Sequence, residues 1–146
     1  EALDMAADDL DNLPNLYYDL SARIPILGLP GRRARHAREF LLEYQDRILF
    51  GTDLIYDDTN VPTGLQAQEL FQPYEIPLDG ADPVERYVET SVEFVQSHLE
   101  FLLTDHVQEH PPFKRSKRPF SIVGLNLPAE VNEKILFRNA ERLIPQ

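Results

Sequence analysis

The chain has 146 residues, enough for one domain with its own hydrophobic core and too few to expect two. Its hydrophobic share of 42%, charged share of 27% and net charge of −11 suit a globular protein in water and argue against nucleic acid or an anionic membrane surface as the main partner. The sequence has no cysteine and no apolar run near the ~20 residues that span a bilayer, so we expect no disulfide, no thiolate chemistry and no membrane span in it.

The first dozen residues predict an amphipathic helix. Acidic residues alternate with apolar residues that recur at helical spacing, namely Leu3, Ala6, Ala7, Leu10 and Leu13. Pro14 and Asn15 end this pattern. The chain opens inside the helical pattern and without a methionine, from which we expect that further sequence precedes Glu1.

Two short strands with a helix between them follow. The segment 16–21 predicts a strand that ends in polar residues, and proline and glycine over 25–31 predict an irregular loop. One apolar face over 32–44 predicts a helix. The second strand, 47–53, ends abruptly at Asp53. The carboxyl ends of parallel strands are where α/β proteins hold ligands and metals, so this arrangement predicts an enzyme cleft.

The second half of the chain predicts mainly helices. A short helix is expected from about 62 to 71, followed by a stretch rich in proline and glycine. Asp82 is placed as the N-cap of a long helix whose apolar stripe continues to Leu102. The segment 120–123 predicts a short strand, and a last helix begins at Pro128.

Two parts of the chain resemble the metal-dependent amidohydrolase superfamily, in particular its amidohydrolase-2 branch of TIM-barrel hydrolases and decarboxylases. The first resembles the seventh and eighth barrel strands of that branch and comprises PNLYYDLSAR (14–23), YQDR (44–47) and FGTD (50–53). The second is similar to the closing helix of the branch and comprises GLNLP (124–128), EKI (133–135) and NAERL (139–143). The likeness is weakest between residues 72 and 117.

The resemblance implies an α/β fold, namely the C-terminal part of a (β/α)₈ TIM barrel with its seventh and eighth strands and a C-terminal helical region. We expect one domain over 1–146, with barrel strands and helices in 1–71 and a helical extension in 72–146. Such enzymes take metal ligands from a His-x-His motif on the first strand and from histidines on the fifth and sixth strands, and none of these matches a position in this chain. The implied activity is metal-dependent hydrolysis or decarboxylation of a small carboxylic acid or related substrate, and the chain alone is expected to be inactive.

The resemblance also assigns site residues. Asp53 matches the eighth-strand acid, which implies that it is a metal ligand and the catalytic proton carrier, with zinc as the expected ion. One carboxylate is far short of a coordination shell, so this chain alone is not expected to retain the metal. From its position after a strand, Asp53 would equally suit the N-cap of a following helix.

Two more residues are predicted to bind substrate. Arg23 follows the first strand, and its guanidinium could grip a substrate carboxylate, although a solvated loop arginine has the same sequence pattern. Ser21 shares a strand face with Asp19, so either residue could line the barrel or form a buried polar tie.

Other polar clusters offer weaker alternatives. The segment 106–110 has the H-x-x-E-H order of an inverted zincin motif, which needs both histidines on one helical face, and the prolines at 111 and 112 favour a polar helix end instead. The arginines of the helix predicted over 32–44 indicate a solvated face, at Arg32, Arg33, Arg35 and Arg38.

A second hypothesis makes the chain a non-catalytic structural or interaction module derived from such a barrel. Two strands cannot close a barrel, so their open edges need partners. This predicts a homo-oligomer or pairing with the missing barrel portion. The remaining expected partner is a small-molecule substrate, with no nucleic acid and no membrane, and the cytoplasm is the default location.

Overall fold

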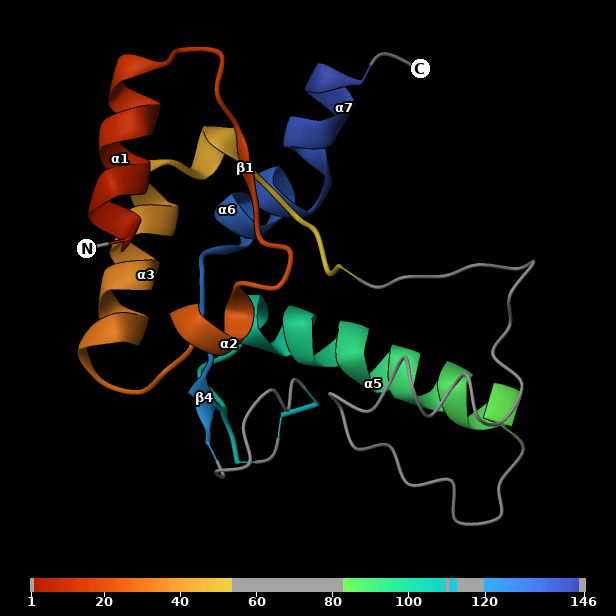
Figure 1. The fold of residues 1–146 in the computed structure, drawn as a ribbon. Helices are drawn as coiled ribbons and strands as arrows, with labels where there is room; N and C mark the ends of the chain where they lie inside the picture. Colours follow the sequence, from red (N-terminus) through yellow and green to blue (C-terminus); the bar gives the residue numbers. More distant parts are fainter. Residues whose placement is uncertain (1, 54–82, 110, 113–119, 145–146) are drawn as a thin grey trace.

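The computed structural model describes residues 2–53, 83–109, 111–112 and 120–144 and has an α/β fold (Figure 1). The helix predicted over 62–71 and the cap predicted at Asp82 lie outside these residues. The first part contains α1 (Ala2–Asn12), β1 (Tyr18–Asp19), α2 (Ile24–Leu27), α3 (Arg32–Glu43), η1 (Gln45–Arg47) and β2 (Ile48–Leu49). The second part contains α5 (Pro83–Leu103), β3 (Val107–Gln108), β4 (Ile122–Val123), α6 (Ala129–Glu133), the π-helical η3 (Lys134–Arg138) and α7 (Asn139–Leu143).

The predicted strand–helix–strand unit is confirmed. β1 and β2 pair in parallel, with Tyr18 opposite Ile48 and Asp19 opposite Leu49, and α3 forms the connection between them. Because side chains alternate along a strand, one face of the pair carries Tyr18 and Ile48 and continues to Leu20. Leu20 and Ile48 are buried on this face, which α1 and α3 cover side by side (Figure 1).

The loop predicted over 25–31 contains a helical turn, α2, so that expectation was wrong for its first residues. Pro25 stands in the first turn, where its missing N–H costs no helical hydrogen bond, and Gly28 ends the turn. The Gly28 carbonyl then accepts a hydrogen bond of 2.8 Å from the amide of Val123 in β4. This contact joins the two parts of the chain.

The closing helical segment covers the outer edge of β2. The Phe50 amide donates to the carbonyl of Ile135 in η3 at 2.9 Å. Asn139 is buried, and its Nδ2 donates to the carbonyls of Gln45 and Ile48 at 2.7 and 2.8 Å. These bonds satisfy strand groups that face away from β1, so within the described residues this edge is closed.

The C-terminal end of α5 is capped by the segment 124–127. The last carbonyls of a helix lack partners within it. Here the amides of Leu125 and Leu127 donate to the carbonyls of Phe101 and Leu102 at 2.7 and 2.9 Å. Beyond this cap, β3 pairs antiparallel with β4, and the sequence pattern did not indicate β3.

One hydrophobic core unites these elements. It contains side chains from α1 through η3, among them Leu10, Leu41, Ile48, Phe101, Ile122 and Ile135. No helix among the described residues has both the length and the apolar character needed to cross a membrane.

A buried histidine, His98 of α5, makes the stability of this core depend on pH. Its ring lies 4.5 Å from that of Phe94 and 6.3 Å from that of Phe50, measured between centroids, and its Nδ1 lies 2.7 Å from the Phe94 carbonyl oxygen. Burial lowers the pKa of His98 below its ordinary value, and the backbone hydrogen bond opposes this effect less strongly. The folded chain therefore binds a proton at this imidazole less readily than the unfolded chain does.

We expect the free energy of unfolding to fall as pH is lowered from about 6.5, because the unfolded chain then binds a proton at His98 that the folded chain excludes. The slope from this single group is at most about 1.4 kcal/mol per pH unit. Urea denaturation between pH 7.5 and 5.5 measures this slope in the unsubstituted chain and in the two variants His98→Gln and His36→Gln. The half-buried His36 is the control. His98→Gln should remove the slope and His36→Gln should keep it, whereas equal slopes in both variants would contradict the assignment.

Candidate functional site

The polar residues of the candidate site gather at the carboxyl ends of β1 and β2. Asp19 and Leu49 occupy the sheet face opposite α1 and α3, and strand alternation continues this face to Ser21 and Gly51. A Cβ atom on Gly51 would collide with Ser21 Oγ and lie 3.2 Å from Asp19 Oδ1. The side chains of Ser21 and Asp19 therefore lie against Gly51, in the space that a side chain at residue 51 would need.

Ser21 and Asp19 form a local turn rather than a buried polar tie. The Ser21 amide donates to Asp19 Oδ1 at 2.7 Å, which is the pattern of an Asx turn. Asp19 is exposed and Ser21 is half-buried, so the alternative of a buried tie is wrong for Asp19. Ala22 follows with a φ of 55°, and this left-handed residue turns the chain sharply after the strand.

Asp53 lies two residues beyond Gly51 and is exposed. Its φ of 63° is in the left-handed region, which aspartate tolerates better than most residues. The alternative role as N-cap of a following helix concerns residues outside the described part of the chain. Asp53 thus follows the carboxyl end of β2, close in sequence to the contact between Gly51 and Ser21.

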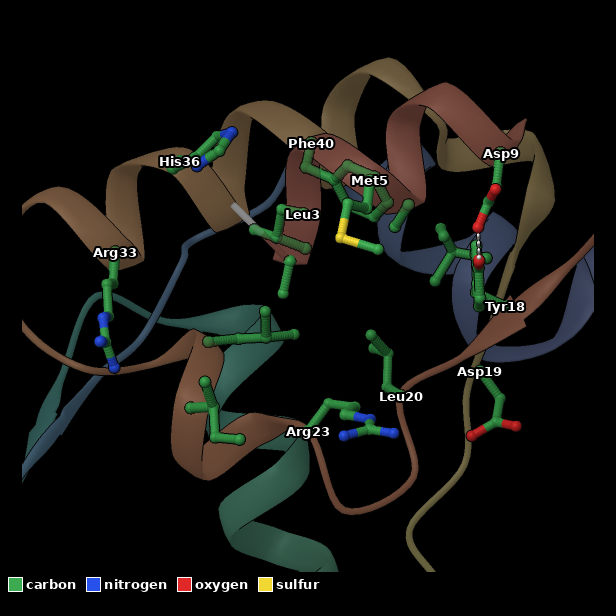
Figure 2. A pocket seen from close by; sticks show the side chains of 15 residues that line it. Leu3, Met5, Asp9, Tyr18, Asp19, Leu20, Arg23, Arg33, His36 and Phe40 are labelled. Carbon is green, nitrogen blue, oxygen red and sulfur yellow. Dashed lines mark hydrogen bonds between the residues drawn. The ribbon is translucent and has the colours of Figure 1, made fainter. Parts of the chain in front are cut away.

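Arg23 lies elsewhere, at a pocket of about 600 Å³ on the helix-covered side of β1 (Figure 2). The floor of this pocket includes the buried side chains of Leu20, Phe40 and Ile48. Arg23 is exposed and lines the pocket, whereas Ser21 and Asp53 are not among its described lining residues. The structure therefore does not bring the two predicted substrate-binding residues, Arg23 and Ser21, to one pocket.

The rim of this pocket carries charges of both signs (Figure 2). Arg33 and His36 of α3 line one end, and His36 Nε2 lies 3.2 Å from Asp4 Oδ1. At the other end Tyr18 donates its hydroxyl hydrogen to Asp9 Oδ2 at 2.9 Å. This hydrogen bond, aided by burial, raises the pKa of Tyr18.

Sequence reasoning missed this pocket because its lining residues come from five elements, α1, β1, α2, α3 and β2, and no local motif marks them. The clearest sign of this pocket in the sequence was Met5, a large apolar residue that lies outside the apolar stripe of α1. Met5 is 65% exposed and projects into the pocket (Figure 2).

The other polar clusters form no metal site within the described residues. Among the residues that the structure describes, no three histidine or acidic side chains lie close enough together to hold an ion. The H-x-x-E-H alternative fails for 106–109, because α5 ends at Leu103 and β3 occupies Val107–Gln108, so the motif lacks its helix and the predicted polar helix end is also wrong. His110 lies outside the described residues.

The arginines of α3 are only partly a solvated face. Arg32, Arg33 and Arg35 are exposed as predicted. Arg38 is half-buried, and its Nε donates to the Leu125 carbonyl at 3.0 Å. This residue joins α3 to the segment that caps α5, which the spacing of the arginines could not indicate.

Comparisons with known proteins found no matching family profile, no matching curated protein and no matching solved structure.

Proposed function

We propose that this chain is the C-terminal portion of a metal-dependent amidohydrolase-like enzyme that hydrolyses or decarboxylates a small carboxylic acid or related substrate. The observation that supports this most is the convergence of Asp19, Ser21 and Gly51 at the carboxyl ends of two parallel strands, with Asp53 just beyond. In barrel enzymes catalytic side chains come from the carboxyl ends of the strands, and the helices lie on the opposite face.

In this proposal Asp53 is one metal ligand and the proton carrier of the reaction. Zinc is the expected ion, and a bound divalent ion lowers the pKa of a coordinated water so that it can act as a nucleophile at neutral pH. The described residues do not by themselves make a zinc site. The remaining ligands would come from residues outside the described part, and this chain alone is expected neither to retain zinc nor to catalyse the reaction.

Ser21 is the proposed substrate contact, because its hydroxyl faces Gly51 at the strand ends. Arg23 stays a predicted substrate ligand. It lines the pocket on the helix-covered side of β1, however, and Ser21 does not, which favours a separate role for Arg23. By default we place the enzyme in the cytoplasm.

The test uses the protein that is encoded by the full reading frame containing these residues. We expect it to carry zinc, measured by elemental analysis, and to turn over one member of a panel of small carboxylic acids and their amides. Asp53→Asn should lower turnover by about 100-fold or more, since it removes an ionised ligand and a proton carrier. Asp105→Asn, an exposed acid outside the site, is the matched control and should keep activity. Normal turnover by Asp53→Asn would refute the assignment.

The second candidate is a non-catalytic structural or interaction module. It is favoured by the apolar pocket beside β1, where Met5 and Ile26 are 65% and 54% exposed. If the protein encoded by the full reading frame binds no zinc but forms a stable complex through this pocket, that result would support the interaction module and not the enzyme.

A further inference from the structure

The outer edge of β1 has no partner strand among the residues that the structure describes. In the parallel pair the Leu20 amide donates to the Leu49 carbonyl at 3.1 Å, so Leu20 directs its backbone toward β2. Backbone groups alternate in direction along a strand, so the N–H and C=O of Asp19 point away from β2. Within the described part of the chain, β1 pairs with β2 alone.

The two edges of this sheet differ. At β2 the closing segment supplies bonds to Ile48 and Phe50, whereas at β1 the neighbouring feature is the apolar pocket (Figure 2). An exposed strand edge is a ready template for another strand, and a two-stranded sheet is marginally stable by itself. The edge of β1 is therefore the place where this sheet can be extended.

The pocket has the position and composition to receive the side chains of such a strand. Leu20 and Ile48 form its floor on the helix-covered face of the sheet, and Met5 and Ile26 line it from α1 and α2. A strand paired with β1 would lie about 4.8 Å away and direct alternate side chains toward this face. Those side chains would enter the pocket and meet apolar atoms.

The position of α1 indicates the direction of the added strand. α3 precedes β2 and covers the sheet, while α1 precedes β1, packs beside α3 and covers the same face (Figure 1). Each helix thus leads into a strand of one parallel series. A strand that led into α1 by a right-handed crossover of the same kind would run parallel to β1 on its outer side.

We infer that the outer edge of β1 and the pocket beneath it form the docking site of one extended β-strand, which comes from outside the described residues and pairs in parallel with β1. Apolar side chains at alternate positions of this strand fill the pocket, which continues the sheet already present. An acidic residue at its carboxyl end matches Arg23, which follows the carboxyl end of β1. The inference rests on the proposed function only where it identifies this strand as part of a barrel.

The test tethers a probe strand to the full chain. Ala2 and Leu3 line the pocket, so an extension ahead of residue 1 begins close to it. The probe has the sequence Thr-Val-Lys-Val-Thr-Val-Glu followed by Gly-Ser-Gly, and a short tether gives it a local concentration in the millimolar range. We expect hydrogen exchange at the Asp19 amide to slow by about 10-fold or more, which corresponds to about 1.4 kcal/mol.

Three controls make the result specific. An extension with serine in place of each valine should give no protection of Asp19. In the tethered chain Met5→Glu should abolish protection, and Ile144→Glu should not, because Ile144 is 68% exposed but does not line the pocket. Absent protection with the valine probe, or protection that Met5→Glu leaves unchanged, would overturn the inference.

A second copy of the chain is the competing occupant of this site. Light scattering on the untethered chain would reveal a dimer, and a dimer that Met5→Glu disperses would show that a second copy occupies the site, which overturns the strand proposal. The exchange measurement involves neither zinc nor turnover. Failure of the enzyme assignment at Asp53 would therefore leave its outcome unaffected.

Discussion

Gly124→Ala is expected to lower the free energy of unfolding by about 3 kcal/mol or more, the upper range for forcing atoms into a packed interior. Gly124 is buried, and an added Cβ would collide with the Thr104 carbonyl oxygen, lie 2.8 Å from the Thr104 carbonyl carbon and lie 3.1 Å from the Glu100 carbonyl oxygen. These are backbone atoms at the end of α5, so no side-chain rotation can relieve the contact. The segment 124–127 would have to move away from the carbonyls that it caps.

Gly31→Ala is the matched control. Gly31 has a φ of 85° and a ψ of −128°, a backbone conformation that is disfavoured for a residue with a Cβ atom, and nothing lies within 4 Å of an added Cβ. The penalty is therefore backbone strain alone, about 1–3 kcal/mol. Urea denaturation of both variants measures the difference, and hydrogen exchange at Leu125 and Leu127 should increase only in Gly124→Ala. Hydrogen exchange at Leu125 and Leu127 that Gly124→Ala leaves unchanged would contradict the close approach.

Asn139→Ala should lower the free energy of unfolding by about 3 kcal/mol. The side-chain amide of Asn139 donates hydrogen bonds to the carbonyls of Gln45 and Ile48. Each buried polar group that is left without a partner costs about 1–3 kcal/mol. Because Ile48 is in β2, we also expect faster exchange at the neighbouring Phe50 amide, which bonds to η3. Urea denaturation and hydrogen exchange measure the two effects.

Asn12→Ala controls for the removal of a side-chain amide as such. Asn12 is exposed, and its Nδ2 donates to the Asp8 carbonyl at 2.7 Å. Water can replace that bond, so the loss should stay within about 0.5 kcal/mol. If Asn139→Ala were as mild as Asn12→Ala, the closing segment would not be holding the edge of β2 through this residue.

Local patterns were sufficient for the longer helices. The stripe from Leu3 to Leu10 predicted α1, and the spacing of Ala34, Ala37 and Phe40 predicted α3, because a helix that buries one face must repeat apolar residues every three or four positions. The same logic located α5 and α6. It did not indicate α2, which spans only four residues, nor β3.

The candidate site was predictable in part. Strand alternation placed Asp19 and Ser21 on one face, and the break after Phe50 placed Asp53 beyond the second strand. Arg23 could not be placed this way, since the left-handed Ala22 turns the chain after the strand. The enzyme assignment at Asp53 itself stays a prediction.

Local patterns were enough to predict the long helices α1, α3 and α5, the strand–helix–strand unit and the acidic residue after its second strand, since each depends on residues near one another in the chain. Three-dimensional packing was needed to show that Asn139 closes the edge of β2, that Gly124 fits against the end of α5, and that an apolar pocket lies beside β1. These features depend on contacts between residues up to about ninety positions apart, as between Asn139 and Ile48. Local periodicity carries no information about such contacts, because they arise when separate elements pack together.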